Sequence, residues 1–138
     1  MVHRIQQHYL LDTSICIDFL RGNKTALHHF IKEDGHCFLS VITKIELLMG
    51  AYNAPKPYFL TELHKVQTFI DRYDTIGLDN SMHRFCSEKI RLQRTGLLIE
   101  DFDLLIATTA IANNMVVVTS NKKHFERVEG IKMEDWSQ

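Results

Sequence analysis

Residues 104–121 read LLIATTAIANNMVVVTSN, a stretch without a charged side chain. Its length and apolar character are those of a membrane-spanning helix. The pair Asn113–Asn114 divides it, however, and the second half contains a run of valines, which favour strands. We therefore predict a helix over residues 102–113 and a buried strand over residues 115–119. This order of elements indicates an α/β protein rather than a membrane protein.

The rest of the chain alternates in the same way. Apolar runs predict strands over residues 8–11 and 37–41, with weaker candidates at 73–78 and 131–133. Helices are predicted over residues 15–20, 24–32, 43–50, 58–71 and 80–95. We expect Thr43 to cap the third of these helices. Strands that are apolar throughout are typical of a mainly parallel sheet covered on both faces, so the sequence predicts one α/β domain over residues 1–138.

Composition excludes several classes of protein. Of 138 residues, 45% are hydrophobic and 24% charged, which is the balance of a globular protein and not of a disordered or collagen-like chain. The formal net charge of −1 argues against a protein that is basic overall, but a local cationic surface remains compatible with it. Three widely spaced cysteines predict free thiols and a reducing, cytoplasmic location. Polar residues interrupt the apolar N-terminal run, so we expect neither a secretory signal nor a membrane partner.

Three acidic residues stand where predicted strands and helices meet. Asp12 follows the first strand, Glu46 lies in the helix after the second strand, and Asp103 begins the last long helix. Any one of them has an ordinary explanation as a helix cap or a solvated side chain. Parallel sheets, however, form their sites beyond the carboxyl ends of the strands. Three acids gathered there are costly to bury unless they are paired or bind a metal.

The chemistry of these side chains indicates the metal. Carboxylate oxygens without a cluster of cysteines and histidines favour Mg²⁺ or Mn²⁺ over zinc. Two such ions about 4 Å apart can stabilise the attacking and leaving oxygens of phosphodiester hydrolysis and can activate water as the nucleophile. Without a cation, crowded carboxylates repel one another, so we expect the metal-free site to be strained.

Other catalytic signatures are absent from the sequence. The six glycines are too scattered for a G-x-G-x-x-G or P-loop pattern, and no G-x-S-x-G stretch occurs. His83 and Cys86 have the spacing of zinc ligands, but no second pair completes the set. A receiver domain would need a second acid beside Asp12, where Leu11 and Thr13 stand instead.

Several motifs occur in an order similar to that of one family. They are LLDTS at 10–14, SVITKIEL at 40–47, DLLIA at 103–107, VVTSN at 117–121 followed by Phe125, and MEDW at 133–136. Together they span essentially the whole chain. They resemble the motifs of PIN-domain ribonucleases, and among these the VapC-like toxins of type II toxin–antitoxin pairs.

The resemblance implies a three-layer α/β/α fold and a divalent-metal-dependent endoribonuclease that cleaves RNA by attack of metal-activated water. It implies that Mg²⁺ (or Mn²⁺) is bound by Asp12, Glu46 and Asp103. Hydroxyl groups that would support these ligands through hydrogen bonds are those of Thr13, Ser14 and Thr119.

Partners are implied in the same way. Toxins of this type are inhibited by a cognate antitoxin whose tail enters the site, so we expect an antitoxin partner, a homodimer, and contact with operator DNA only through the antitoxin. The substrate is RNA. Structured loops such as the anticodon loop of tRNA expose both bases and phosphates, and are one expected target.

One position departs from the family's pattern. A fourth acid often stands where this chain has Asn121, which can orient water but is a weaker ligand. We keep Asn121 as a site residue, and the number of metal ions stays open. Glu100 and Asp101 either compensate or only place negative charge at a helix N-terminus. The substitution also supports an alternative function, a catalytically weak PIN-like subunit that acts with an antitoxin as a transcriptional co-repressor; the retained acids argue against it.

RNA binding requires cations near the carboxylates, because the phosphates would otherwise be repelled. The candidates close to the acids in sequence are Lys44, Lys122, Lys123 and Arg127. A second candidate set at helical spacing is Arg84, Arg91 and Arg94, which fits a solvated helix surface equally well. His124 is interpreted as a loop histidine, with phosphate binding as the alternative.

Overall fold

Within residues 6–138, which the computed structural model describes, five strands form one parallel sheet in the order β3-β2-β1-β4-β5. The strands are β1 Tyr9–Leu11, β2 Cys37–Ser40, β3 Asp74–Ile76, β4 Val116–Val118 and β5 Met133–Glu134. The central strand is β1, whose Leu10 pairs with Phe38 of β2 on one side and with Val117 of β4 on the other. The mainly parallel sheet is confirmed. Residues 1–5 of the predicted domain lie outside the described residues.

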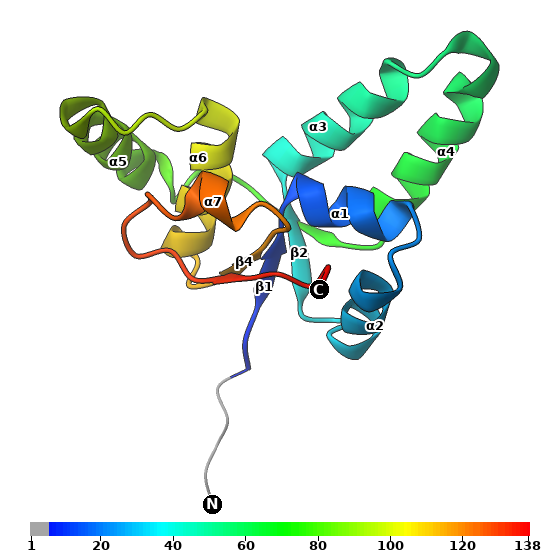
Figure 1. Ribbon diagram of the computed structural model, residues 1–138, viewed down its shortest axis with the longest axis horizontal. Coiled ribbons are helices and arrows are strands. Elements are labelled where there is room, and N and C mark those ends of the chain that lie inside the picture. Colours follow the sequence, from blue (N-terminus) through cyan, green and yellow to red (C-terminus); the bar gives the residue numbers. More distant parts are fainter. Residues whose placement is uncertain (1–5) are drawn as a thin grey trace, which may run out of the picture.

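Helices cover both faces of this sheet and give the expected three-layer α/β/α fold (Figure 1). One face carries α1 Thr13–Leu20, α2 Lys24–Lys32, α3 Val41–Tyr52 and α4 Phe59–Ile70, with a short 3-10 turn, η1 Lys56–Tyr58, between the last two. The opposite face carries α5 Met82–Thr95, α6 Asp101–Ala112 and α7 Lys122–Phe125.

Strands β1 and β4 are apolar throughout because each contributes side chains to two hydrophobic cores, one on each face of the sheet. Tyr9 and Leu11 of β1 pack with α1–α4, whereas Leu10 packs with α5–α7. In β4, Val116 and Val118 belong to the first core and Val117 to the second. Side chains alternate along a strand, so a sheet covered on both faces needs an apolar residue at every position.

The start of α3 differs from the prediction. The helix begins at Val41 rather than after Thr43, because the Ser40 hydroxyl accepts the Thr43 backbone N–H at 3.0 Å and so caps the helix. Thr43 is buried inside the first turn, where its hydroxyl donates to the Leu11 carbonyl at 3.3 Å. The predicted Thr43 cap is therefore wrong, although the helix itself is confirmed.

The strand order brings three chain segments together at one edge of the sheet. From β1 the chain proceeds outward to β2 and β3, then crosses to the other side of β1 as β4. Asp12 and Thr119 directly follow β1 and β4, and Ser40 is the last residue of β2. These residues lie where the direction of winding reverses, which is where α/β folds place their sites. No helix within residues 6–138 is both long and apolar enough to cross a membrane.

Candidate active site

Asp12 is the most enclosed acid at this edge, with 4% of its surface exposed. It occupies the N-cap position of α1, yet its carboxylate makes no capping hydrogen bond. Instead, its Oδ2 accepts the hydroxyls of Ser14 and Thr119, both at 2.8 Å. The carboxylate is thus held from two segments of the chain, and its Oδ1 has no partner within residues 6–138.

The loop after β4 is tied to the same hydroxyls. The Ser120 N–H donates to the Ser14 Oγ at 3.1 Å, and the Asn121 N–H donates to the Thr119 Oγ1 at 2.9 Å. The predicted supporting residues Ser14 and Thr119 therefore meet around Asp12. The side chain of Asn121, in contrast, is exposed and has no hydrogen bond in the part of the chain that the structure describes.

Glu46 lies on α3 and is held by the third predicted hydroxyl. The Thr13 Oγ1 donates to its Oε1 at 2.6 Å, across 33 positions of sequence. Burial raises the pKa of Glu46, the Thr13 hydrogen bond opposes this shift, and the negative charges of Asp12 and Glu100 add to it. Because Thr13 directly follows Asp12 in the chain, its hydrogen bond brings Glu46 to the same end of the sheet as Asp12.

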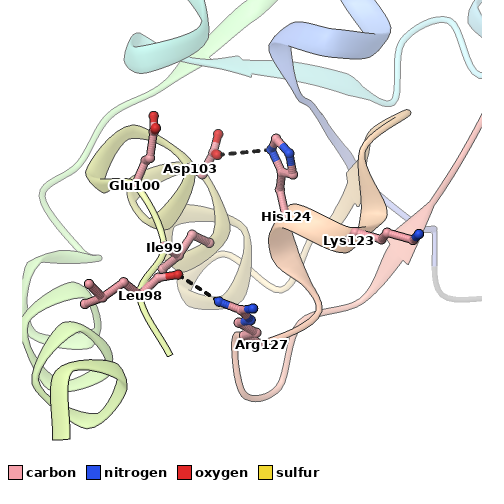
Figure 2. A pocket seen from close by; sticks show the side chains of 7 residues that line it. All are labelled: Leu98, Ile99, Glu100, Asp103, Lys123, His124 and Arg127. Atoms are coloured by element: carbon pink, nitrogen blue, oxygen red, sulfur yellow. Dashed lines mark hydrogen bonds and ion pairs between the residues drawn. The ribbon is translucent and has the colours of Figure 1, made fainter. Parts of the chain in front are cut away.

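Asp103 is the third acid, on the first turn of α6 with 23% of its side chain exposed. Burial raises its pKa to about 6, and repulsion by Asp12 is the next largest cause. The opposing influence is His124 of α7, whose Nδ1 lies 3.6 Å from the Asp103 Oδ2 (Figure 2). His124 is therefore a helical residue facing the acids, and its interpretation as a loop histidine is wrong.

The two acids beside Asp103 have different surroundings. Asp101 forms a solvent-exposed salt bridge with Lys89 of α5. Glu100 lines a cavity together with Asp103, and its charge raises the pKa of both Asp103 and Glu46. Of the two residues that could compensate for Asn121, only Glu100 lies with the acid cluster.

The candidate RNA-binding cations are distributed unevenly. Lys123 and Arg127 line the cavity that contains Asp103, and Lys122 lines a neighbouring hollow with Asn121. Lys44 is half-buried on α3 and belongs to neither cavity.

Two residues of the second candidate set are engaged in structural contacts. Arg91 donates to both carboxylate oxygens of the buried Glu88, at 2.6 and 2.9 Å, and to the Arg127 carbonyl at 2.9 Å. Arg84 donates to the Glu129 carbonyl at 3.0 Å. Arg84 and Arg91 therefore join α5 to the chain after α7. They form neither a free RNA-binding face nor a merely solvated helix surface.

The donor set is suited to a hard divalent cation. Asp12, Glu46 and Asp103 gather at one edge of the sheet, and the pKa values of Glu46 and Asp103 are raised by burial and by the neighbouring negative charges, which a cation would relieve. Within residues 6–138, no three acidic, histidine or cysteine side chains stand close enough as they are to share one ion. Metal binding by Asp12, Glu46 and Asp103 therefore requires the side chains to draw together.

The amino-acid sequence matches the family model described as PIN domain over residues 9–131, which include both the sheet and the candidate site. The chain belongs to the PIN-domain family. The tRNA(fMet)-specific endonuclease VapC of Shigella flexneri is 30% identical to it over 131 residues, which are 94% of this chain and 98% of that protein. Ribonuclease VapC1 of Methanocaldococcus jannaschii is 33% identical, with coverage of 91% and 86%.

Solved structures agree with this assignment. The PIN domain superposes on a chain of DNA-bound VapBC from Salmonella typhimurium with a TM-score of 0.88, at 30% identity, over 95% of this chain and 99% of that one. VapBC2 of Rickettsia felis, bound to a promoter DNA fragment, gives a TM-score of 0.86 at 27% identity, with coverage of 94% and 99%. The resemblance to VapC toxins seen in the motifs is confirmed.

Proposed function

We propose that this PIN domain is a Mg²⁺- or Mn²⁺-dependent endoribonuclease and the toxin of a toxin–antitoxin pair. The observation that carries the proposal is the convergence of Asp12, Glu46 and Asp103, two of which are held by hydroxyl groups of Thr13, Ser14 and Thr119. A scaffold without catalysis has no use for carboxylates that repel one another. The names of the VapC relatives as ribonucleases support the same reaction.

The residues of the site have separable roles in this proposal. Asp12, Glu46 and Asp103 hold the metal, which when bound supplies water activation and charge stabilisation at the scissile phosphate. Ser14 and Thr119 fix the orientation of Asp12, and Thr13 fixes that of Glu46. His124, Lys123 and Arg127 offset the negative charge of the RNA backbone next to the acids.

Structured RNA with an exposed loop, tRNA included, is the substrate class that we propose. A single-stranded loop can bring one phosphate into a recessed site without opening a duplex. The naming of the Shigella flexneri relative as specific for tRNA(fMet) supports this class.

The antitoxin is proposed to occupy the groove between α1, α3 and α4. Apolar side chains of Ile17, Leu20 and Leu47 line this groove, and Glu46 also borders it. An antitoxin segment with an apolar face and a cation directed at Glu46 would cover both groove and active site.

The protein is also proposed to form a homodimer, which is supported by exposed apolar side chains such as Met49 and Tyr52 of α3. Light scattering should then give a mass in solution of twice 16.1 kDa.

Cleavage of total bacterial RNA by purified, antitoxin-free protein tests the proposal. With Mn²⁺ we expect discrete products that disappear with EDTA, and Asp12→Asn should reduce the rate at least about 100-fold. Asp79→Asn changes an exposed acid outside the site and serves as the matched control. Cleavage that Asp12→Asn retains, or none by the folded wild type, would contradict the proposal.

The second candidate function is a catalytically weak subunit that helps an antitoxin repress a promoter. The neutral, exposed side chain of Asn121 favours it, and VapBC relatives have been crystallised with DNA. It predicts operator binding by the complex together with an inactive free protein. The cleavage experiment above separates the two functions.

A further inference from the structure

The cavity beside Asp103, about 320 Å³ in volume, is flanked by two short segments of chain. One flank is the linker of residues 97–100, which leads into α6. The other is the four-residue helix α7 with the turn of residues 126–130 that follows it. Segments this short do not hold their shape alone, so contacts with the rest of the fold must fix the distance between them.

Apolar burial fixes only part of this arrangement. Phe125 and Val128 of the second flank are buried in the core on the α5–α7 side of the sheet. Such contacts are non-directional, and they set the depth of the flank more than its orientation. Hydrogen bonds and ion pairs, which are directional, are therefore needed to orient the side chains that face the cavity.

Two polar contacts of the described residues cross the cavity (Figure 2). The Nδ1 of His124 lies 3.6 Å from the Oδ2 of Asp103, and the Arg127 guanidinium donates to the Leu98 carbonyl at 3.1 Å. The first contact belongs to the proposed active site. The second joins the turn after α7 to the linker ahead of α6, and so connects the two segments that carry His124 and Asp103.

The turn that carries Arg127 is held in place by a buried carboxylate. Glu88 of α5 is 4% exposed, and its two oxygens accept the Arg91 guanidinium at 2.6 and 2.9 Å. Arg91 also donates to the Arg127 carbonyl at 2.9 Å, and the Glu88 Oε2 accepts the Glu129 N–H at 2.6 Å. The backbone of the turn is thus bound to α5 at two points.

We infer that Glu88 is a positioning residue of the proposed active site, which sets the separation of Asp103 from His124. It acts through Arg91, which holds the turn after α7, and through Arg127, which holds the linker ahead of α6. None of the described residues that line the cavity belongs to α5, so the effect of Glu88 on the reaction is indirect. The inference rests on the proposed ribonuclease function.

Glutamine at position 88 removes the network without changing its volume. The Glu88 Oε1 faces the Arg91 Nε, and Oε2 faces both the Arg91 Nη2 and the Glu129 N–H. The amide NH₂ of Glu88→Gln therefore meets another donor whichever oxygen it replaces. Arg91→Lys is a second variant, which keeps the charge but cannot span the same acceptors with a single amine.

Dipolar EPR spectroscopy in EDTA measures the separation of the two flanks. Nitroxide labels are attached to Phe102→Cys on α6 and Lys122→Cys on α7, both exposed positions, in a Cys86→Ser background that removes the exposed thiol. Glu88→Gln should shift or broaden the distribution of distances between the labels. Arg91→Lys should do the same.

Cleavage of RNA with saturating Mn²⁺, measured without labels, gives the second readout. A misplacement of about 1 Å can cost about 100-fold in rate, so we expect kcat to fall about 10- to 100-fold in Glu88→Gln, with a smaller change in KM. Glu126→Gln makes the same change of charge at an exposed acid. Ile70→Val lowers stability in the core on the opposite face of the sheet. Both controls should keep the kcat and the label distances of the wild type.

The inference is overturned if Glu88→Gln and Arg91→Lys keep the label distances of the wild type, or if the distances change while kcat does not. It is also overturned if Ile70→Val loses kcat to the same extent, because the effect would then be one of stability. A wild type that cleaves no RNA would reject the ribonuclease, and the label distances would still decide whether Glu88 positions the two flanks. Cleavage by the wild type with unchanged distances in both variants would reject only the inference.

Discussion

Asp103 combines two properties that conflict in the folded protein, a partly buried position and a negative charge near Asp12. Its pKa in the folded state is about 6, raised from 3.8, so folding favours the protonated form. The stability that the protonated carboxyl contributes is complete below about pH 4 and is lost as the pH rises through 6. A cation bound at physiological pH would therefore stabilise the fold as well as serve catalysis.

Replacing Asp103 by asparagine removes this conflict. In EDTA at pH 8 we expect Asp103→Asn to melt at a temperature equal to the wild type's or up to about 5 °C higher, and the difference should vanish at pH 4. Addition of Mn²⁺ should raise the melting temperature of the wild type more than that of the variant. Differential scanning fluorimetry measures all three effects. A variant that melts several degrees lower in EDTA would identify Asp103 as structural.

The hydroxyl group of Thr119 is expected to contribute to metal affinity through its hydrogen bond to Asp12. It is fully buried, donates to Asp12 and accepts the Asn121 N–H. Thr119→Val keeps the shape and removes these hydrogen bonds together with the one to the Ser14 hydroxyl, so we expect Mn²⁺ affinity, measured by calorimetry, to fall about 10- to 100-fold. Thr108→Val, in which the lost hydrogen bond lies within α6, is the control and should bind as the wild type. Equal affinities in both variants would contradict this role.

At the scale of elements, α5 and the chain after α7 are joined through one buried carboxylate. Glu88 accepts two hydrogen bonds from Arg91 and the Glu129 N–H at 2.6 Å. The hydrogen bonds from Arg91 are the main cause that lowers the pKa of Glu88. The ionised form therefore stabilises the fold, and this contribution is lost as the pH falls below about 4.5 toward the folded pKa.

Glu88→Gln weakens this connection without changing its shape. We expect the melting temperature at pH 7 to fall by about 3–8 °C and the difference to shrink as the pH falls below 4. Glu126→Gln alters an exposed acid in the same part of the molecule and should have no effect. Equal melting temperatures for the two variants would mean that Arg91 and Glu129 find other partners.

The elements that the sequence predicted well are those with a local signal. Strands β1, β2 and β4 were predicted because they are short apolar runs bounded by polar residues, and the burial of both sheet faces followed from the same pattern. Helix α7 was missed because it spans four residues and has three basic side chains among them. The structural role of Arg91 could not be inferred, since its carbonyl partner Arg127 is 36 positions away.

The whole molecule brings its acids and cations together through topology rather than through sequence proximity. The positions of Asp12 and Glu46 at one edge could be predicted, because each follows a strand and parallel strands end at the same edge. The contact of His124 with Asp103 could not, because it depends on how α7 packs across α6. Likewise, only the fold separates Glu100, which faces the cavity, from Asp101, which pairs with Lys89.

Affinity for RNA should depend on few charges, because the net charge of the chain is −1. The basic residues that line the two hollows next to the acids are Lys122, Lys123 and Arg127. For contacts with three phosphates of a single strand we expect the logarithm of the binding constant to fall with the logarithm of salt concentration with a slope of about −2. A slope near zero, measured by fluorescence anisotropy, would show that these cations do not contact phosphates.

The alternation of β1 and β4 between two cores has a consequence for how this protein can evolve. One codon inserted into β1 would turn every later side chain of the strand to the opposite face. It would also displace Asp12 by about 3.3 Å along the strand, away from Thr119 of the neighbouring segment. Changes in length are therefore confined to connections such as the η1 turn, while the strands can diverge only by exchanging one apolar residue for another. Lineages of this protein should differ by insertions far from the sheet and by point substitutions within it.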